Sequence, residues 1–128
     1  MKTNRGRAES HSRRGQATFT GVVHQDLVLD GCPAIVIFDG FFEPGARSYW
    51  HSHEGGQVLL VKAGQGHIHT RSDESSPLRP GDVVYADPGE EHWHGANPDT
   101  FVIHTAISIG ATTWLEAVSD TEYQRSAG

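Results

Sequence analysis

The chain has 128 residues, with 10 basic, 16 acidic and 9 histidine side chains, so its formal net charge is −6 at pH 7. The charge is uneven, because residues 1–14 sum to +4 and the rest of the chain sums to −10. An acidic body excludes a general nucleic-acid surface, and no apolar run approaches the ~18 residues that a membrane span needs.

Residues 1–16 are expected to form a disordered basic arm in front of a single domain at 17–128. The arm holds too few apolar residues to pack, whereas the rest of the chain is long enough to bury a core. Arg13 and Arg14 are not followed by an apolar stretch, which argues against a twin-arginine signal. Cys32 is the lone cysteine, so no intramolecular disulfide can form, and these features together predict a cytoplasmic protein.

Short runs of β-branched and aromatic residues alternate with turn signals at intervals of about eight to twelve residues. That spacing predicts an all-β sandwich or barrel. The predicted strands are, in chain order, Ala34–Phe42, Gln57–Lys62, His67–Arg71, Asp82–Ala86 and Thr100–Ile109. Residues 17–29 are expected to cover a sheet edge or to pair with a second subunit, which predicts a homodimer or higher homo-oligomer. A closed barrel of about eight strands can enclose one small ligand, so a small-molecule substrate is expected.

Helical signal is confined to the C-terminus. Ser119 and Glu122 have the spacing of a capping box, which predicts a short helical turn through Gln124. Three apolar residues are expected to anchor this tail on the barrel: Trp114, Leu115 and Val118.

Two His-x-His pairs, His51/His53 and His92/His94, each follow a glycine and a turn. Side chains two residues apart on a strand point to one face, at a spacing of about 6–7 Å, so His51 and His53 can converge on one ion. Gln57 has the same parity, and the intervening glycines can bend the chain to bring it closer. His92 would complete a three-imidazole set from a second strand, leaving positions open for water or substrate.

These residues resemble two motifs of the cupin family of double-stranded β-helix (jelly-roll) proteins. The first motif, G-x5-H-x-H-x3,4-E-x6-G, is matched by Gly45, His51, His53, Gln57 and Gly64. The second motif, G-x5-P-x-G-x2-H-x3-N, is matched by Gly81, Gly89 and His92, but Asp87 and Ala96 stand at its proline and asparagine positions. The resemblance covers roughly residues 34–107 and implies a single all-β cupin barrel.

A narrower resemblance, from Phe19 to Tyr123, is to the small single-domain cupins that include bacterial hydroxynitrile lyases. It is carried by Phe42–Arg47, Trp50–His53, Pro80–Val84, Pro88–Gly95 and Val118–Tyr123. In that group glutamine replaces the carboxylate ligand. The resemblance implies four ligands of a divalent metal: His51, His53, Gln57 and His92. The implied metal is manganese, with iron, nickel, cobalt or zinc as alternatives. Two further histidines are implied for proton transfer, His94 and His104, with a slight preference for His104.

Gln57 leaves all four implied ligands neutral, so a divalent ion would keep a charge near +2, which favours Lewis-acid chemistry over dioxygen chemistry. The leading hypothesis is therefore a metal-dependent lyase, similar to hydroxynitrile lyases, that cleaves or forms a cyanohydrin or a related small carbonyl compound. Two alternatives stay open. One is a dioxygenase, decarboxylase or isomerase of a small aromatic or keto acid, and the other is a non-catalytic cupin that binds a small molecule.

Other polar and aromatic residues are expected to have structural roles. His67 and His69 form a third His-x-His pair outside both motifs and are expected at the surface or rim. Arg47 is expected to pair with Glu43. Four aromatic residues could either shape the pocket or pack in the body of the protein: Tyr49, Trp50, Tyr85 and Trp93.

Overall fold

The structure is a computed structural model that describes residues 1–4, 13–14 and 17–127. Its strands are β1 (Arg13–Arg14), β2 (Phe19–Thr20), β3 (Val23–Leu29), β4 (Ile35–Phe42), β5 (Arg47–Ser48), β6 (His51–His53), β7 (Gln57–Gly64), β8 (Gly66–Thr70), β9 (Ser75–Leu78), β10 (Val83–Ala86), β11 (His92–Ala96), β12 (Val102–Ile109) and β13 (Thr112–Trp114). One helix, α1 (Asp120–Ala127), follows them. No helix within the described ranges is both long and apolar enough to cross a membrane.

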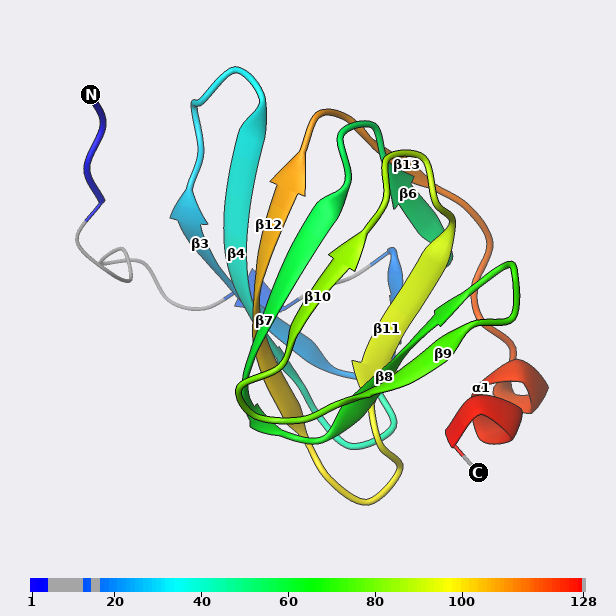
Figure 1. Cartoon of the computed structure of the whole chain (residues 1–128). Helices are drawn as coiled ribbons and strands as arrows, with labels where there is room; N and C mark the ends of the chain where they lie inside the picture. The colour runs from blue at the N-terminus through cyan, green and yellow to red at the C-terminus, as the bar shows by residue number, and fades with distance from the viewer. Residues whose placement is uncertain (5–12, 15–16, 128) are drawn as a thin grey trace.

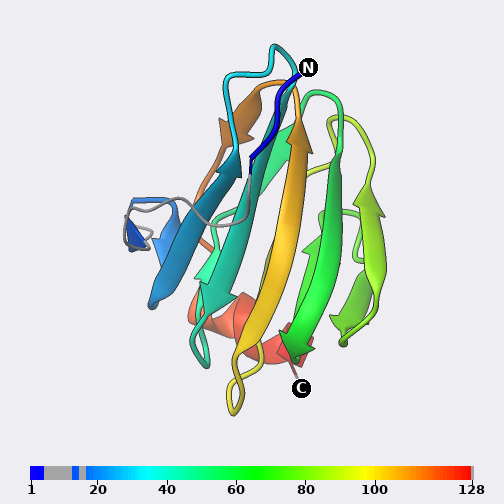
Figure 2. The same ribbon diagram turned by 90° about the vertical axis from the view of Figure 1, so that its left-hand side faces the viewer.

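The strands form two antiparallel sheets that face each other and curl into a barrel (Figure 1). The first sheet has the order β1-β3-β4-β12-β7-β10, and Figure 2 shows its long strands side by side. The second sheet has the order β13-β6-β11-β5-β2, with β8 and β9 added beside β11. The predicted all-β jelly-roll barrel with a short C-terminal helix is confirmed.

Each of the five predicted strand runs forms a strand, with ends that shift by at most two residues. Residues 17–29 contribute β2 and β3, and β3 covers the edge of β4. The prediction of a disordered arm falls mainly on residues 5–12 and 15–16, which lie outside the described residues. In the described part, Arg13 and Arg14 form β1 against β3, so the disorder of residues 1–16 stays a prediction.

The barrel is packed at one end and hollow at the other. On β4, Phe42 belongs to the apolar core and also borders a cavity, which Val36 and Phe38 line further along the strand. On β12, Val102 belongs to the same core, and His104 lines the cavity together with Ala106 and Ser108. Because alternate residues of each strand point inward, the core and the cavity follow each other along the same strands.

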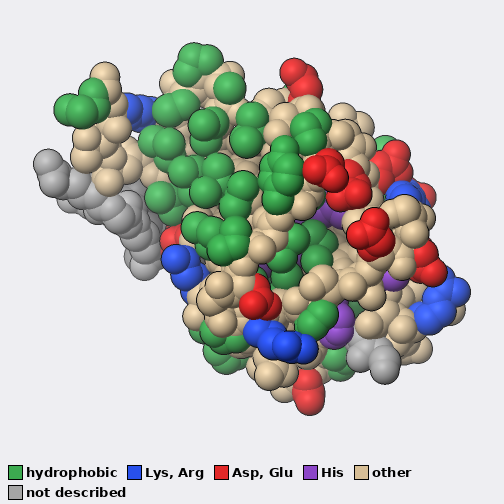
Figure 3. Space-filling model, viewed as in Figure 1, with side chains coloured by type: hydrophobic (Ala, Val, Ile, Leu, Met, Phe, Trp, Pro, Cys, Tyr) green, Lys and Arg blue, Asp and Glu red, His purple; other side chains and the backbone are tan. Residues whose placement is uncertain are grey.

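The outer face of the first sheet carries an apolar row across five strands. Its members are direct cross-strand neighbours: Leu29, Ile37, Ile107, Val58 and Tyr85. Figure 3 shows hydrophobic side chains gathered over the upper parts of this sheet. Val83 and Tyr85, both on β10, are 67% and 54% exposed. The homodimer predicted from the sequence stays a prediction.

The C-terminal tail covers the outer face of the second sheet (Figure 1). Val118, Tyr123 and Leu115 pack there against Trp50 and Trp93. The prediction that Leu115 and Val118 anchor the tail is therefore confirmed. Of the two roles left open for Trp50 and Trp93, packing in the body of the protein is the one observed, because both rings lie under the tail and neither lines the cavity.

Arg47 ties the tail to the barrel from a buried position. Its guanidinium donates to Asp120 at 2.7 Å and to the Val118 carbonyl at 3.0 Å, and it lies 4.5 Å from the centre of the Tyr123 ring. The expected pairing of Arg47 with Glu43 is wrong, because Glu43 bonds to His24 at 2.9 Å instead. Asp120 is 73 positions from Arg47 in the chain, so the sequence alone could not identify it as the partner.

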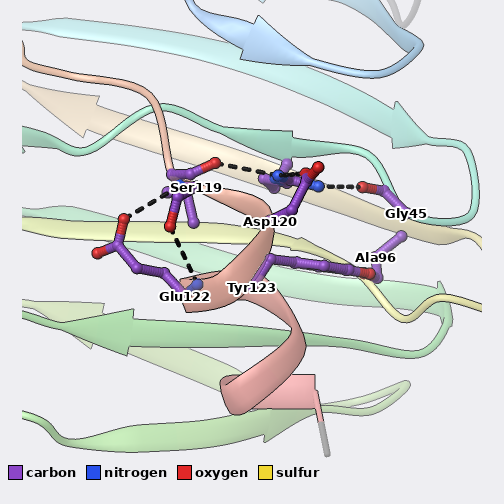
Figure 4. Close-up of polar contacts among 8 residues, drawn as sticks. Gly45, Ala96, Ser119, Asp120, Glu122 and Tyr123 are labelled. Atoms are coloured by element: carbon purple, nitrogen blue, oxygen red, sulfur yellow. Dashed lines mark hydrogen bonds and ion pairs between the residues drawn. The ribbon is translucent and has the colours of Figure 1, made fainter.

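The capping box at the start of α1 is present as predicted (Figure 4). The Ser119 hydroxyl accepts from the Glu122 backbone N–H at 3.1 Å, and the Glu122 carboxylate accepts from the Ser119 N–H at 3.0 Å. The Tyr123 hydroxyl donates to the Ala96 carbonyl at 2.5 Å. The helix ends at Ala127, three residues beyond the predicted end.

Replacing Ser119 with alanine is expected to lower the free energy of unfolding by about 1 kcal/mol, because the Glu122 N–H loses its cap. Urea denaturation would measure the change. Thr121→Ala is the matched control, since Thr121 is an exposed residue of the same turn. Equal effects of the two substitutions would show that the cap does not stabilise the tail.

Candidate metal centre

Three of the predicted ligands lie together on two adjacent strands. His51 and His53 are on β6 and His92 is on β11, where it pairs directly with His51. One ring nitrogen from each lies within 4.8 Å of the others, and all three residues are buried. The His-x-His spacing and the pairing of the two strands therefore bring these imidazoles to one point.

The three rings are oriented by bonds from their Nδ1 atoms. The partners are the Tyr49 carbonyl for His51 (2.8 Å), the Glu90 carbonyl for His92 (2.9 Å) and the Thr112 hydroxyl for His53 (3.0 Å). A carbonyl can only accept, so Nδ1 carries the proton in His51 and His92, and Nε2 is left with a lone pair. The Nε2 of His53 is buried and has no hydrogen-bond partner among the described residues. Such outer bonds are typical of histidines that bind metals.

Gln57 completes the cluster from the opposite sheet. Its side-chain oxygen lies 3.1 Å from Nε2 of His92, and its NH2 group donates to the Ser108 hydroxyl at 3.1 Å. With the ring proton of His92 on Nδ1, both facing atoms are acceptors. Two buried acceptors at this distance fit a site that holds a cation, so the residues present fit a divalent metal.

A glycine turn carries the chain from His53 to Gln57. Gly56 has a φ of 90°, and a Cβ atom there would lie 2.7 Å from the Ala86 carbonyl oxygen. Only glycine fits both conditions without strain. The turn moves the chain from one sheet to the other, so Gln57 faces the histidines across the barrel instead of following them along one strand.

The buried imidazoles are neutral near pH 7. Burial, with a smaller effect of His92, lowers the pKa of His53 to about 4. Burial also lowers the pKa of His51 well below its usual value and lowers that of His92. Burial disfavours the charged form, so the lone pairs that a metal needs are free.

A second histidine pair lies beside this cluster. Nε2 of His104, on β12, and Nδ1 of His94, on β11, are 3.1 Å apart. Both residues line the cavity, as parity predicts for His94. Burial lowers the pKa of His104 to about 4, and burial together with His104 lowers the pKa of His94 well below its usual value. Burial outweighs the opposing effect of Asp39 on His104, so both rings are neutral near pH 7.

The two clusters share one cavity of about 190 Å³. Its apolar wall consists mainly of Phe19, Val36, Phe38, Phe42 and Trp114. Trp114 packs on the barrel, as predicted, but it does so at the cavity and not with Leu115 and Val118. Trp114 lies on β13 opposite His51, its ring centre is 4.6 Å from that of His51, and it is 41% exposed.

Several site residues were missed by the sequence analysis. Ser108 and Phe38 could have been found from strand alternation, because Ser108 has the parity of His104 and Phe38 has that of Phe42. Thr112 and Trp114 had no such signal, since only the pairing of β13 with β6 brings them to the histidines. Tyr85 does not line the cavity and is exposed on β10.

The third His-x-His pair lies outside the cavity, as predicted. His69 stacks on Trp93 with ring centres 6.0 Å apart, and it bonds to Asp73 at 3.2 Å. Neither His67 nor His69 lines the cavity. The same spacing therefore produced a buried site in one place and a half-buried surface pair in another.

Comparison with known proteins agrees with this geometry. The sequence model of the cupin domain family matches residues 40–108 of this chain. The (R)-mandelonitrile lyase of Granulicella tundricola is 43% identical over 113 residues, which cover 84% of this chain and 86% of that protein. A cupin-like protein from Thermotoga maritima superposes with a TM-score of 0.81 at 35% identity, over 98% of this chain and 96% of its own. The polyketide cyclase RemF of Streptomyces resistomycificus shares the fold at 15% identity, with a TM-score of 0.75 over 97% of this chain and 92% of its own. The chain belongs to the cupin domain family.

Proposed function

We propose that the protein is a metal-dependent lyase that cleaves, or in reverse forms, a small cyanohydrin or a related carbonyl compound. The observation that carries the proposal is one cavity in which two of the three convergent imidazoles, an amide and a second histidine pair face an apolar wall, with the third imidazole, His92, beside the amide. The name of the 43% identical relative supports an aromatic cyanohydrin as the substrate.

Four neutral residues are the proposed ligands of a divalent metal: His51, His53, Gln57 and His92. A bound ion would supply Lewis-acid stabilisation of negative charge on the substrate oxygen. Among the described residues that line the cavity there is no carboxylate, so the protein offsets none of the charge of the ion. Manganese is the proposed metal. Nickel, copper and zinc bind nitrogen-rich sites more tightly, so the metal content depends on supply.

His94 is the proposed proton carrier. Its Nδ1 is bonded to His104, which leaves Nε2 as the ring nitrogen available to the cavity. In the cleavage direction, the hydroxyl proton of the substrate passes to His94 as the carbonyl forms. The C–C bond breaks and its electron pair leaves with cyanide, which then takes the proton from His94. The products are an aldehyde and HCN.

His104 is proposed to act through His94. Its Nε2 bonds to His94, and its Nδ1 is buried with no partner among the described residues. It therefore orients the His94 ring and sets which nitrogen carries the proton. This order reverses the slight preference for His104 that the sequence suggested.

The apolar wall supports an aromatic substrate. Phe19 and Trp114 meet edge to face, with ring centres 5.9 Å apart, and Phe19 also packs on Phe42. Aromatic rings pack well in such arrangements. Since Trp114 is partly exposed and lies over His51, we assign it to the mouth of the cavity, where it would shield the polar end of the substrate from water.

The proposal is tested with manganese-loaded protein and mandelonitrile, by following benzaldehyde absorbance. Wild-type protein is expected to turn over, and His94→Gln is expected to lose about 100-fold or more in kcat, because positioned acid–base groups contribute about 10²–10⁴-fold. The metal content of the variant, measured by elemental analysis, is expected to stay unchanged.

His69→Gln is the matched control, since it makes the same change on the outer face of β8. Absence of mandelonitrile turnover by the metal-loaded wild type would refute the lyase assignment. Oxygen uptake with a catecholic substrate would then favour the dioxygenase alternative. A metal-free protein that still binds the small molecule would favour a non-catalytic cupin.

A further inference from the structure

Gln57 and Ser108 form a buried cross-strand pair. They lie directly opposite each other on β7 and β12, and they are 4% and 7% exposed. The NH2 group of Gln57 donates to the Ser108 hydroxyl at 3.1 Å, while the amide oxygen faces His92. Ser108 thus contacts the side of Gln57 that points away from the three imidazoles.

An amide at this position has a requirement that a carboxylate lacks. A carboxylate presents two equivalent oxygens, so either can bind a cation. An amide presents one oxygen and one NH2 group, and turning it by 180° points two donors at the cation site. The turned amide could also donate to Nε2 of His92, which would occupy a lone pair that the metal needs.

Ser108 offers the acceptor that makes the binding orientation favourable. A buried NH2 group without an acceptor is costly, and Ser108 holds the acceptor for this group among the described residues. Without it, the amide would gain by turning its NH2 group toward His92. With Ser108 present, the NH2 group has its acceptor, so the orientation that points the amide oxygen at the histidines carries no penalty for an unpaired donor.

We infer that Ser108 is a positioning residue that holds the Gln57 amide with its oxygen toward His51, His53 and His92, so that Gln57 can bind the metal. The inference rests on the proposed ligand set but not on the proposed reaction. It explains how a neutral ligand works at a position where the family motif has glutamate.

The test is a double-mutant cycle on the Kd for Mn²⁺, measured on metal-free protein by competition with a chelating indicator. In the wild-type background, Ser108→Ala is expected to raise the Kd by about 10-fold or more, because outer partners of metal ligands carry about 10–100-fold in affinity. In the Gln57→Glu background, the same substitution is expected to change the Kd by less than about 2-fold, because a carboxylate needs no orientation.

Ser108→Thr keeps the hydroxyl and is expected to restore the Kd to within about 3-fold of wild type. Thr105→Ala is the matched control, because it removes a hydroxyl from β12 that bonds to Asp39 at 2.6 Å outside the cavity. Thermal unfolding of each metal-free variant would report its folding.

Equal rises of the Kd in both backgrounds would show a general structural effect and overturn the inference. So would an unchanged Kd in Ser108→Ala, no rescue by Ser108→Thr, or a wild-type protein that does not bind Mn²⁺. Should Gln57→Glu fail to fold, the contrast between Ser108→Ala and Ser108→Thr decides. A protein that shows the expected Kd pattern but does not cleave mandelonitrile would refute the lyase and leave this inference intact.

Discussion

Replacing His53 with alanine is expected to lower the affinity for Mn²⁺ by at least about 100-fold and to abolish mandelonitrile cleavage, since outer partners of metal ligands alone carry about 10–100-fold. The physical reason is that Nε2 of His53 is buried, lies close to the other two imidazoles and has no hydrogen-bond partner in the part of the chain that the structure describes. Its removal leaves a metal with three protein ligands and an enlarged cavity. Competition titration of the metal and the absorbance assay of benzaldehyde would measure the two effects.

His24→Ala is the matched control for this prediction. His24 pairs with Glu43 on the surface, outside the cavity, and such an exposed pair contributes little to stability. Both the metal affinity and the activity of this variant are expected to match those of wild type. An unchanged Mn²⁺ affinity in His53→Ala would show that His53 is not a ligand and that the buried cluster has a structural role.

The metal-free protein is expected to lose stability as the pH falls from 6.5 to about 4. Burial lowers the pKa of His104 from 6.5 to about 4. Within this window the unfolded chain binds a proton that the folded chain does not, so acid favours unfolding. His104 contributes about 3 kcal/mol, since each pKa unit corresponds to about 1.4 kcal/mol. Above pH 6.5 this contribution is fully present. Urea denaturation at a series of pH values would measure it.

His104→Gln removes the titrating group and is expected to flatten this pH dependence. The variant should lose about 3 kcal/mol less than wild type between pH 6.5 and 4. Groups that do not contact His104 titrate alike in both proteins, so the difference between the two curves reports His104 together with its effect on His94. Parallel curves would show that His104 is not buried neutral in the folded protein.

Strand alternation explains why much of the site was predictable. His51, His53, His92 and His94 lie at a spacing of two on short strands between glycine turns. That spacing alone sets which side chains share a face. The spacing did not distinguish these two pairs from His67 and His69. The match to the two family motifs made that distinction.

The position of Gln57 could not be derived from strand parity. Parity placed it on the face shared by His51 and His53, but the chain crosses to the other sheet at Gly56. Gln57 reaches the same point because the two sheets face each other across the barrel. Closure of a barrel is a property of the whole chain, so local patterning could not show it.

Alternation, turn chemistry and local spacing were enough to predict the all-β class, the five main strands and the capping box, and the match to the family motifs added the three clustered histidines. The groups that orient the rings and the amide, the bond between His94 and His104, and the positions of Trp114 and Arg47 came from the tertiary structure alone. Those features depend on contacts between residues far apart in the chain, such as Ser108 with Gln57 and Thr112 with His53. Nothing in the local sequence marks such pairs, because strand pairing alone brings them together.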